Sequence, residues 1–156
     1  MVVLEKMTKQ DFESYIENAV KEYAKEKVTA GTWIEEEALK LSKEAFDRLL
    51  PDGVATANQY LYSLVDTDAN VSIGYIWFQL FEKLSGREAF IFDFIIHDRF
   101  RGKGYGTQSM NALEREAHTL DIHKISLHVF GHNHTAIGLY NKMGYVTTDL
   151  HMSKVI

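Results

Sequence analysis

The most constraining feature of this chain is an apolar segment that runs directly into a glycine-rich loop and then into a helical pattern. The apolar segment ends at Ile96, residues 101–106 read Arg-Gly-Lys-Gly-Tyr-Gly, and a helix is predicted from Gly104 to about Thr119. Alternating glycines let the backbone turn tightly and present its N–H groups at the start of the helix. These free N–H groups, the positive end of the helix dipole and the two basic side chains suit a phosphate or pyrophosphate. The segment therefore predicts an anion-binding site.

Two better-known phosphate-binding loops do not fit this segment. The dinucleotide-binding pattern GxGxxG fails because position 107 is a threonine. The Walker pattern fails because no Gly-x4-Gly-Lys-Ser/Thr occurs anywhere in the chain. A plain glycine-rich turn between a strand and a helix, without a ligand, remains the alternative.

Length and composition favour a single domain over residues 1–156. A chain of 156 residues is the usual size of one domain, and its 46% apolar and 25% charged residues exclude a disordered or collagen-like protein. The absence of cysteine excludes disulfide scaffolds, thiolate metal sites and cysteine nucleophiles.

Charge and hydropathy indicate which partners the protein can bind and in which cellular compartment it is expected. A formal net charge of −5 disfavours nucleic acid as a partner. No apolar run approaches the roughly 18–20 residues of a membrane helix, and the first residues lack the apolar stretch of a secretory signal. We therefore expect a cytoplasmic protein with no membrane partner.

Hydrophobic periodicity predicts an α/β (α+β) fold, with helices on both faces of a mixed, mostly antiparallel central sheet. Strands are expected at Val2–Leu4, Gln59–Asp66, Val71–Glu82, Glu88–His97, Lys124–Phe130 and, as a closing strand, Tyr145–Ile156. Helices are expected after Thr8, which can cap a helix with Asp11, and at Ile34–Leu50, Gly104–Thr119 and Asn133–Met143. The strand–helix–strand order in the second half predicts one parallel pair among these strands.

A second informative segment spans residues 127–145. In it a strand meets a polar turn, and a short helix follows with Ala136 and Tyr140 on one face, ended by Gly144. Taken alone, Tyr140 fits a core aromatic residue whose hydroxyl finds a local partner, and Asn133 fits a helix cap. Each residue by itself therefore leaves a purely structural role open.

Together the two segments resemble the GNAT superfamily of acyl-CoA-dependent N-acetyltransferases. The family's loop pattern, Arg/Gln-x-x-Gly-x-Gly/Ala after a strand, is matched by Arg101, Gly104 and Gly106. Its second pattern, Asn-x-x-Ala-x-x-Leu-Tyr-x-x-x-Gly-Phe, is matched by Asn133, Ala136, Leu139, Tyr140, Gly144 and Tyr145. The resemblance implies a single GNAT-like domain in which the strand before the loop splays from its parallel neighbour.

The resemblance also implies how acetyl-CoA binds as cosubstrate, with no metal. Pantetheine would insert between the splayed strands and bond to the backbone of Phe94, Ile95 and Ile96. The pyrophosphate would lie in a cradle formed by Arg101, Gly102, Lys103, Gly104, Tyr105, Gly106 and Thr107. The side chain of Asn133 would also contact the cofactor.

For catalysis, the resemblance implies that Tyr140 is the general acid that protonates the leaving thiolate. A buried phenol with a pKa of about 10 can supply that proton. The amine acceptor must be neutral to attack, so a base is also needed. His128 occupies a strand position where some family members have a glutamate base, and Asp93 is a second candidate that can act through water. A structural role for His128 is equally open.

The acceptor is expected to be a primary amine of a small molecule, peptide or protein, bound by the first half of the chain. Candidate aromatic contacts are Trp33, Tyr75 and Trp77, and candidate acidic ones are Glu22, Glu26, Glu35, Glu36 and Glu37; packing and a solvated helix face are the plainer explanations. A homodimer is expected only by analogy with relatives that dimerise.

Two alternatives to an N-acetyltransferase follow from the same residues. The first is a non-catalytic acyl-CoA-binding sensor or regulatory domain. The second is a metal-dependent hydrolase built on His128, His132 and His134, which we disfavour because no nearby carboxylate completes the ligand set.

Overall fold

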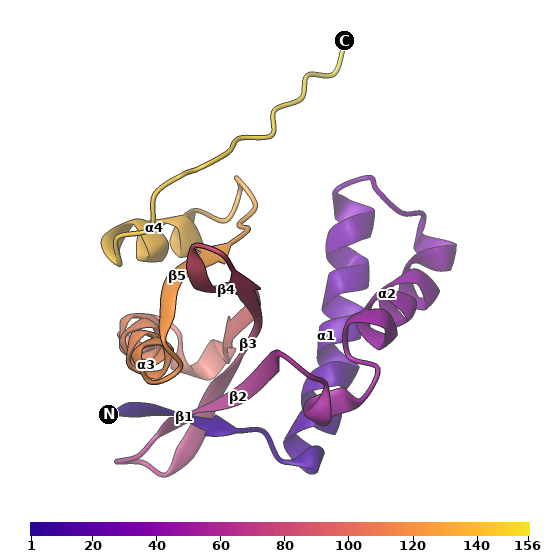
Figure 1. Cartoon of the computed structure of the whole chain (residues 1–156). Coiled ribbons are helices and arrows are strands. Elements are labelled where there is room, and N and C mark those ends of the chain that lie inside the picture. The colour runs from indigo at the N-terminus through magenta and orange to yellow at the C-terminus, as the bar shows by residue number, and fades with distance from the viewer.

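The fold is built on a five-stranded mixed sheet. The computed structural model describes all residues of the chain, 1–156. The strands lie in the order of the sequence: β1 (Val2–Lys6), β2 (Gln59–Asp66), β3 (Val71–Lys83), β4 (Gly86–Ile96) and β5 (Ile122–Leu127). Neighbours are antiparallel except for β4 and β5, which are parallel. This topology confirms the predicted mixed, mostly antiparallel sheet (Figure 1).

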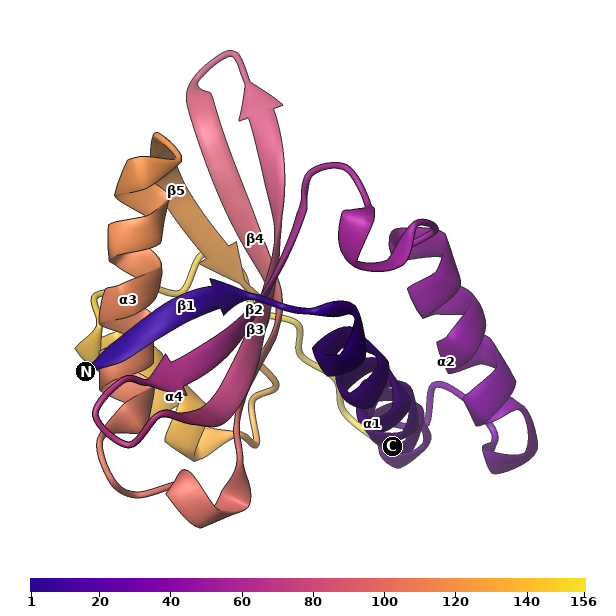
Figure 2. The same ribbon diagram turned by 90° about the horizontal axis from the view of Figure 1, so that it is seen from below.

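Two pairs of helices cover the two faces of the sheet (Figure 2). The helices α1 (Lys9–Thr29) and α2 (Glu35–Leu49) lie on one face, and α3 (Tyr105–Thr119) and α4 (His134–Lys142) lie on the other. Short 3-10 helices occupy Gly53–Ala55 and Asp98–Phe100. The prediction of helices on both faces is therefore confirmed.

Each face has its own hydrophobic core. The larger core packs Phe78, Ile91 and neighbouring strand residues against Met110 and Leu113 of α3. The smaller core, on the α1 side, contains Tyr15, Ala19 and Trp77. Because Trp77 is 2% exposed and its Nε1 donates to Gln59 Oε1 at 2.7 Å, it is a satisfied core residue rather than an exposed substrate contact.

The first helix begins as its sequence predicts. Thr8 Oγ1 accepts the Asp11 N–H at 3.0 Å, and Asp11 Oδ2 accepts the Thr8 N–H at 3.1 Å. This capping box satisfies two backbone donors at the helix start and fixes where α1 leaves the sheet. The side chains of α1 are thereby placed at defined heights above β3 and β4.

A β-bulge in β4 separates a paired half of that strand from an open half. Phe78 pairs with Ile91, but Trp77 pairs with Asp93, so Phe92 is the extra residue. Pairing of β4 with β5 ends at the same level, at Ile91 and Leu127. From Phe92 to Ile96, the edge of β4 that faces β5 therefore has no strand partner, which is the predicted splay.

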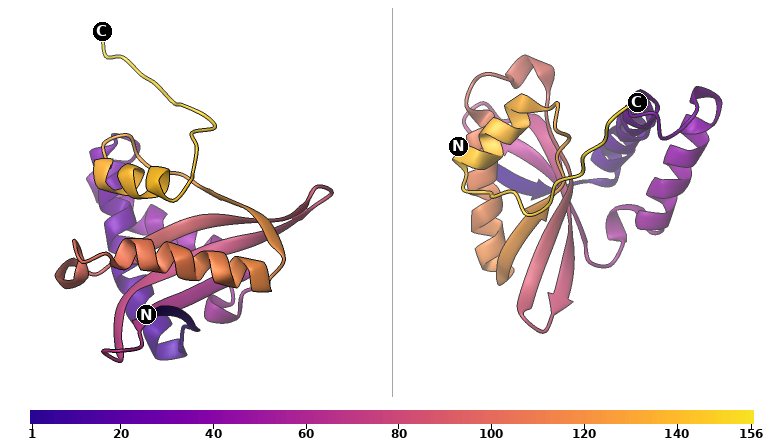
Figure 3. Two further views of the ribbon diagram at one scale, coloured as in Figure 1. Left: turned by 90° about the vertical axis from the view of Figure 1, so that its left-hand side faces the viewer. Right: turned by 90° about the horizontal axis from the view of Figure 1, so that it is seen from above.

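The predicted closing strand at Tyr145–Ile156 is wrong. No residue after Lys142 belongs to a strand or helix, and the chain runs away from the sheet beyond α4 (Figure 3). Val146, Leu150 and Met152 are at least 80% exposed. The alternation of apolar and polar residues is present, but a strand requires a neighbour that completes its backbone hydrogen bonds, and none lies beside this segment.

The other expected bounds need small corrections. The fifth strand covers Ile122–Leu127 rather than Lys124–Phe130, because the chain leaves the sheet where β4 and β5 separate. The remaining strand and helix ends differ from expectation by one or two residues, as is usual at fraying ends. No helix combines the length and the hydropathy needed to cross a membrane.

Candidate active site

The glycine-rich loop forms an open cradle of backbone donors. Gly102 and Gly104 have φ values of +73° and +82°, and Gly104 is the N-cap of α3 without any side-chain capping bond. The first hydrogen bond of α3 runs from the Gln108 N–H to the Gly104 carbonyl. The N–H groups of residues 105–107 therefore have no acceptor within the helix. An added Cβ at either glycine would meet no atom within 4 Å, so space is available for a ligand.

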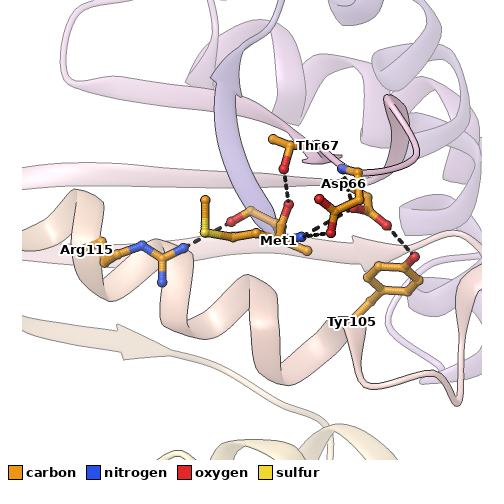
Figure 4. A network of polar contacts seen from close by, with 7 residues as sticks. Met1, Asp66, Thr67, Tyr105 and Arg115 are labelled. Carbon is orange, nitrogen blue, oxygen red and sulfur yellow. Dashed lines mark hydrogen bonds and ion pairs between the residues drawn. The ribbon is translucent and has the colours of Figure 1, made fainter.

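The side chain of Tyr105 anchors this helix start rather than facing the cradle. Its hydroxyl donates to Asp66 Oδ2 at 2.7 Å, and Asp66 Oδ1 accepts the Asp68 N–H at 3.0 Å (Figure 4). The bond from Tyr105, followed by the bond from Asp68, holds the pKa of Asp66 below its usual value. Tyr105 can therefore offer only its backbone N–H, and not its hydroxyl, to a ligand in the predicted cradle.

Three cations surround the cradle. The guanidinium of Arg101 lies 2.9 Å from Asp98 Oδ1 and donates from Nε to the Ile96 carbonyl at 3.0 Å, which orients it at the end of β4. Lys103 Nζ lies 6.0 Å from the Phe100 ring centroid. Lys142, which sequence reasoning missed, donates from the end of α4 to Thr107 Oγ1 at 3.3 Å.

Helix α4 packs directly on the start of α3, which places Tyr140 beside the open half of the sheet. An added Cβ at Gly106 would lie 3.1 Å from Leu139 Cδ2, so the two helices approach closely at this glycine. Asn133 is the N-cap of α4, and its side chain accepts the Ala136 N–H at 3.2 Å. The side-chain oxygen of Asn133 is therefore occupied, and only its amide NH₂ group is left for a ligand.

Tyr140 has the environment of a proton donor. It packs against the larger core, and its ring centroid lies 5.6 Å from that of Tyr145. Burial, and secondarily the carboxylate of Asp93, raises the pKa of Tyr140 to about 12. The phenol therefore stays protonated at neutral pH.

Asp93 approaches the same region from the α1 side. Its Oδ2 accepts a 2.7 Å hydrogen bond from the hydroxyl of Tyr15, a fully buried residue of α1. Burial raises the pKa of Asp93 above its usual value, while the bonds from Tyr15 and from the Phe94 N–H act in the opposite direction. A carboxylate with a raised pKa is a better proton acceptor than an ordinary one.

His128 lies just beyond β5 and is exposed. Ser126 pairs with Phe90, and residues two apart in an extended segment share a face, so His128 continues the row of Ser126 past the bulge of β4. Its ring packs edge-on against Phe130, which stacks on His132, with ring centroids 5.0 and 5.6 Å apart. No three His, Cys, Asp or Glu residues form a metal-binding group, so the three histidines lack the ligand set that a metal hydrolase needs.

The predicted acceptor residues are only partly brought together. Tyr75 packs on Tyr15 with ring centroids 5.4 Å apart, whereas Trp33 packs on Tyr23 near the far end of α1. Glu26 faces the site: burial, followed by the carboxylate of Asp93, raises its pKa, and His132 opposes this shift.

The mixed sheet opens between two parallel strands, next to a helix start with free N–H groups and a protonated tyrosine. This arrangement is that of an acyl-group transferase. The family model of the acetyltransferase (GNAT) family matches residues 22–145. This chain therefore belongs to the GNAT acetyltransferase family and is an acyltransferase.

Two relatives from Bacillus subtilis (strain 168) match nearly the whole chain, and both are described as uncharacterized N-acetyltransferases. YycN is 42% identical over 98% of this chain and 97% of its own length, and YdgE is 36% identical over 97% and 96%. The crystal structure of YycN superposes with a TM-score of 0.93 over 100% of this chain and 99% of that chain. The sequence matches thus show the family, and the superposition with YycN shows the fold.

Proposed function

We propose that this protein transfers the acetyl group of acetyl-CoA directly to a primary amine, without a covalent enzyme intermediate. The observation that carries the proposal is the unpaired edge of β4 between Phe92 and Ile96. This edge includes Asp93, whose carboxylate contributes to the raised pKa of Tyr140. Backbone groups at such an edge can bond an extended ligand as they would bond another strand.

The chain's own groups fit a CoA donor. The part of β4 without a partner on the β5 side, Phe92 to Ile96, matches an extended pantetheine, which would share the Ile96 carbonyl with Arg101 Nε. The free N–H groups at the start of α3 match a pyrophosphate. Arg101, Lys103 and Lys142 provide positive charge around that position. Acetyl-CoA, when bound, supplies an acyl group activated as a thioester.

These residues can carry out both proton transfers that the reaction requires. An amine that attacks the acyl carbon loses one proton, and the departing thiolate gains one. Tyr140 is suited to donate, because its phenol is neutral and not committed to any hydrogen bond within the chain. Asp93 or His128, directly or through water, is suited to accept the proton of the amine.

The acceptor site favours a cationic amine. The carboxylate of Asp93 contributes to the raised pKa of Glu26, and both groups belong to the α1 side of the sheet. A protonated amine placed between them would be attracted before it is deprotonated.

The direct test measures release of the CoA thiol from acetyl-CoA with a panel of peptide N-termini, lysine side chains, polyamines and aromatic amines. We expect release that depends on one class of amine and a product heavier by one acetyl group. Tight acetyl-CoA binding without release for every amine would instead support the sensor alternative. No heat of binding with CoA in calorimetry would refute both.

A further inference from the structure

We propose that Tyr15 is a positioning residue that holds the carboxylate of Asp93 in its ionised form and fixes its orientation on the α1 face of β4. This inference rests on the proposed transfer reaction, in which Asp93 accepts the proton of the amine. Neither the glycine-rich loop nor the α4 segment, which carry the resemblance to the family, contains Tyr15.

The contact between Tyr15 and Asp93 is short and buried, and the ring of Tyr15 is held by a neighbouring aromatic ring. The hydroxyl of Tyr15 lies 2.7 Å from Asp93 Oδ2, and the tyrosine is 2% exposed. Its ring packs on that of Tyr75, which fixes the ring plane of the phenol. Because the Tyr15 hydroxyl is already held in place, its bond to Asp93 needs no further ordering of the side chain when substrate binds.

The bulge in β4 is what makes this contact form. In a regular ladder Asp93 would pair with Ile76, whose side chain belongs to the larger core on the α3 side. The extra residue Phe92 shifts the register by one, so Asp93 pairs with Trp77 and shares the α1 face with it. A single inserted residue therefore places a carboxylate under α1, within reach of Tyr15.

The hydrogen bond from Tyr15 opposes the burial that would otherwise neutralise Asp93. Burial disfavours the charged carboxylate and raises its pKa. Glu26 of α1 lies on the same side, and the carboxylate of Asp93 contributes to its raised pKa. On the other side, Tyr140 of α4 is a neutral phenol whose raised pKa Asp93 contributes to, and His128 follows the end of β5 at Leu127. Apart from the Phe94 N–H on its own strand, the phenol of Tyr15 is the group that favours the ionised form.

Loss of the Tyr15 hydroxyl should therefore raise the pKa of Asp93 and lower the fraction of active base in acidic solution. The replacement Tyr15→Phe removes only the oxygen and keeps the ring. The matched control is Tyr62→Phe, because Tyr62 is also buried and donates to a carboxylate, Glu116 Oε1 at 2.8 Å, but on the α3 side of the sheet.

The experiment compares the pH profile of kcat/KM for the three proteins with the best amine of the panel. Protonation of the amine itself cancels in the ratio of variant to wild type. We expect the ratio for Tyr15→Phe to fall by about tenfold on the acidic side of the profile and to recover toward high pH. The ratio for Tyr62→Phe should be independent of pH.

A second measurement separates failure of this inference from failure of the proposed function. NMR titration of the Asp93 side-chain carboxyl carbon needs no turnover, and it should give a higher pKa in Tyr15→Phe than in the wild-type protein. An unchanged titration overturns the inference, and so does a shifted titration with a flat activity ratio. Absence of transfer by the wild-type protein with every amine refutes the proposed function, whatever the titration shows.

Discussion

The phenol of Tyr140 and the carboxylate of Asp93 belong to opposite faces of the sheet. Tyr140 packs with the core under α3, and Asp93 is bonded to α1, yet the carboxylate contributes to the raised pKa of the phenol. Asp93 lies on the part of β4 beyond its last pair with β5, Ile91 and Leu127. The proposed proton donor and the proposed proton acceptor thus belong to opposite faces of the sheet.

The first prediction concerns Tyr140. Tyr140→Phe should bind CoA like the wild-type protein but lose roughly 100-fold or more in kcat, because the leaving thiolate no longer receives a proton from the enzyme. Since the pKa of Tyr140 is raised to about 12, no basic limb from this residue should appear below pH 10. Steady-state kinetics and calorimetry measure both quantities.

The control for this variant is Tyr145→Phe. Tyr145 is a neighbouring half-buried tyrosine whose pKa is also raised to about 12, mainly by burial. Its variant should keep its turnover. Equal turnover of Tyr140→Phe and the wild-type protein would remove Tyr140 from the proposed role.

The second prediction concerns the conformation of the cradle. Gly104→Ala should lower the free energy of unfolding by about 1–2 kcal/mol, because φ is +82° there, and should weaken CoA binding. Gly138→Ala, inside α4 with no atom within 4 Å of the added Cβ, should instead raise the free energy of unfolding by roughly 0.5–1 kcal/mol. Urea unfolding and CoA titration would show whether the two glycines differ as expected.

The third prediction concerns the acid dependence of stability. The folded-state pKa of Asp66 is lowered, so its stabilisation is present above the unfolded-state pKa of about 3.9 and is lost as the pH falls through the folded value. Tyr105→Phe removes the main cause of the lowered pKa. The difference in urea midpoint between wild type and variant should therefore be largest at neutral pH and shrink below about pH 4.

The background for that test is Asp66→Asn. Adding Tyr105→Phe to this variant should change the urea midpoint by an amount that does not depend on pH. A difference between wild type and Tyr105→Phe that stays constant from neutral to acidic pH would contradict the assignment of the Asp66 shift to Tyr105.

The fourth prediction concerns Lys142. Lys142→Gln should weaken CoA binding by about two- to fivefold, the effect of one partly screened charge, and the loss should diminish at high salt. Lys154→Gln, in the exposed C-terminal segment, removes the same charge away from the cradle. Equal affinities of the two variants would show that Lys142 does not contribute to the donor site.

Much of the fold could be predicted because its signals are local. The capping box of Thr8 and Asp11 predicted the start of α1, and the periodicity of α3 predicted that helix to within one residue at its start. The closing strand was predicted wrongly, because the alternating pattern of residues 145–156 specifies a strand only if another strand lies beside it.

The predicted site divides in the same way. Gly104 indicated the helix start by its spacing alone, whereas Lys142 gave no signal that it would meet Thr107. Tyr15 was visible only as an apolar-face residue of a helix, since its partner Asp93 is 78 residues away.

By itself, the amino-acid sequence determined the glycine-rich helix start, because backbone N–H groups at a helix start and glycines with positive φ depend on neighbours a few residues apart. The tertiary structure alone decided that Asp93 meets Tyr15 and contributes to the raised pKa of Tyr140. The physical reason is that one bulged residue reverses the face of every later side chain in a strand, and the register of strands is set by bonds between distant parts of the chain.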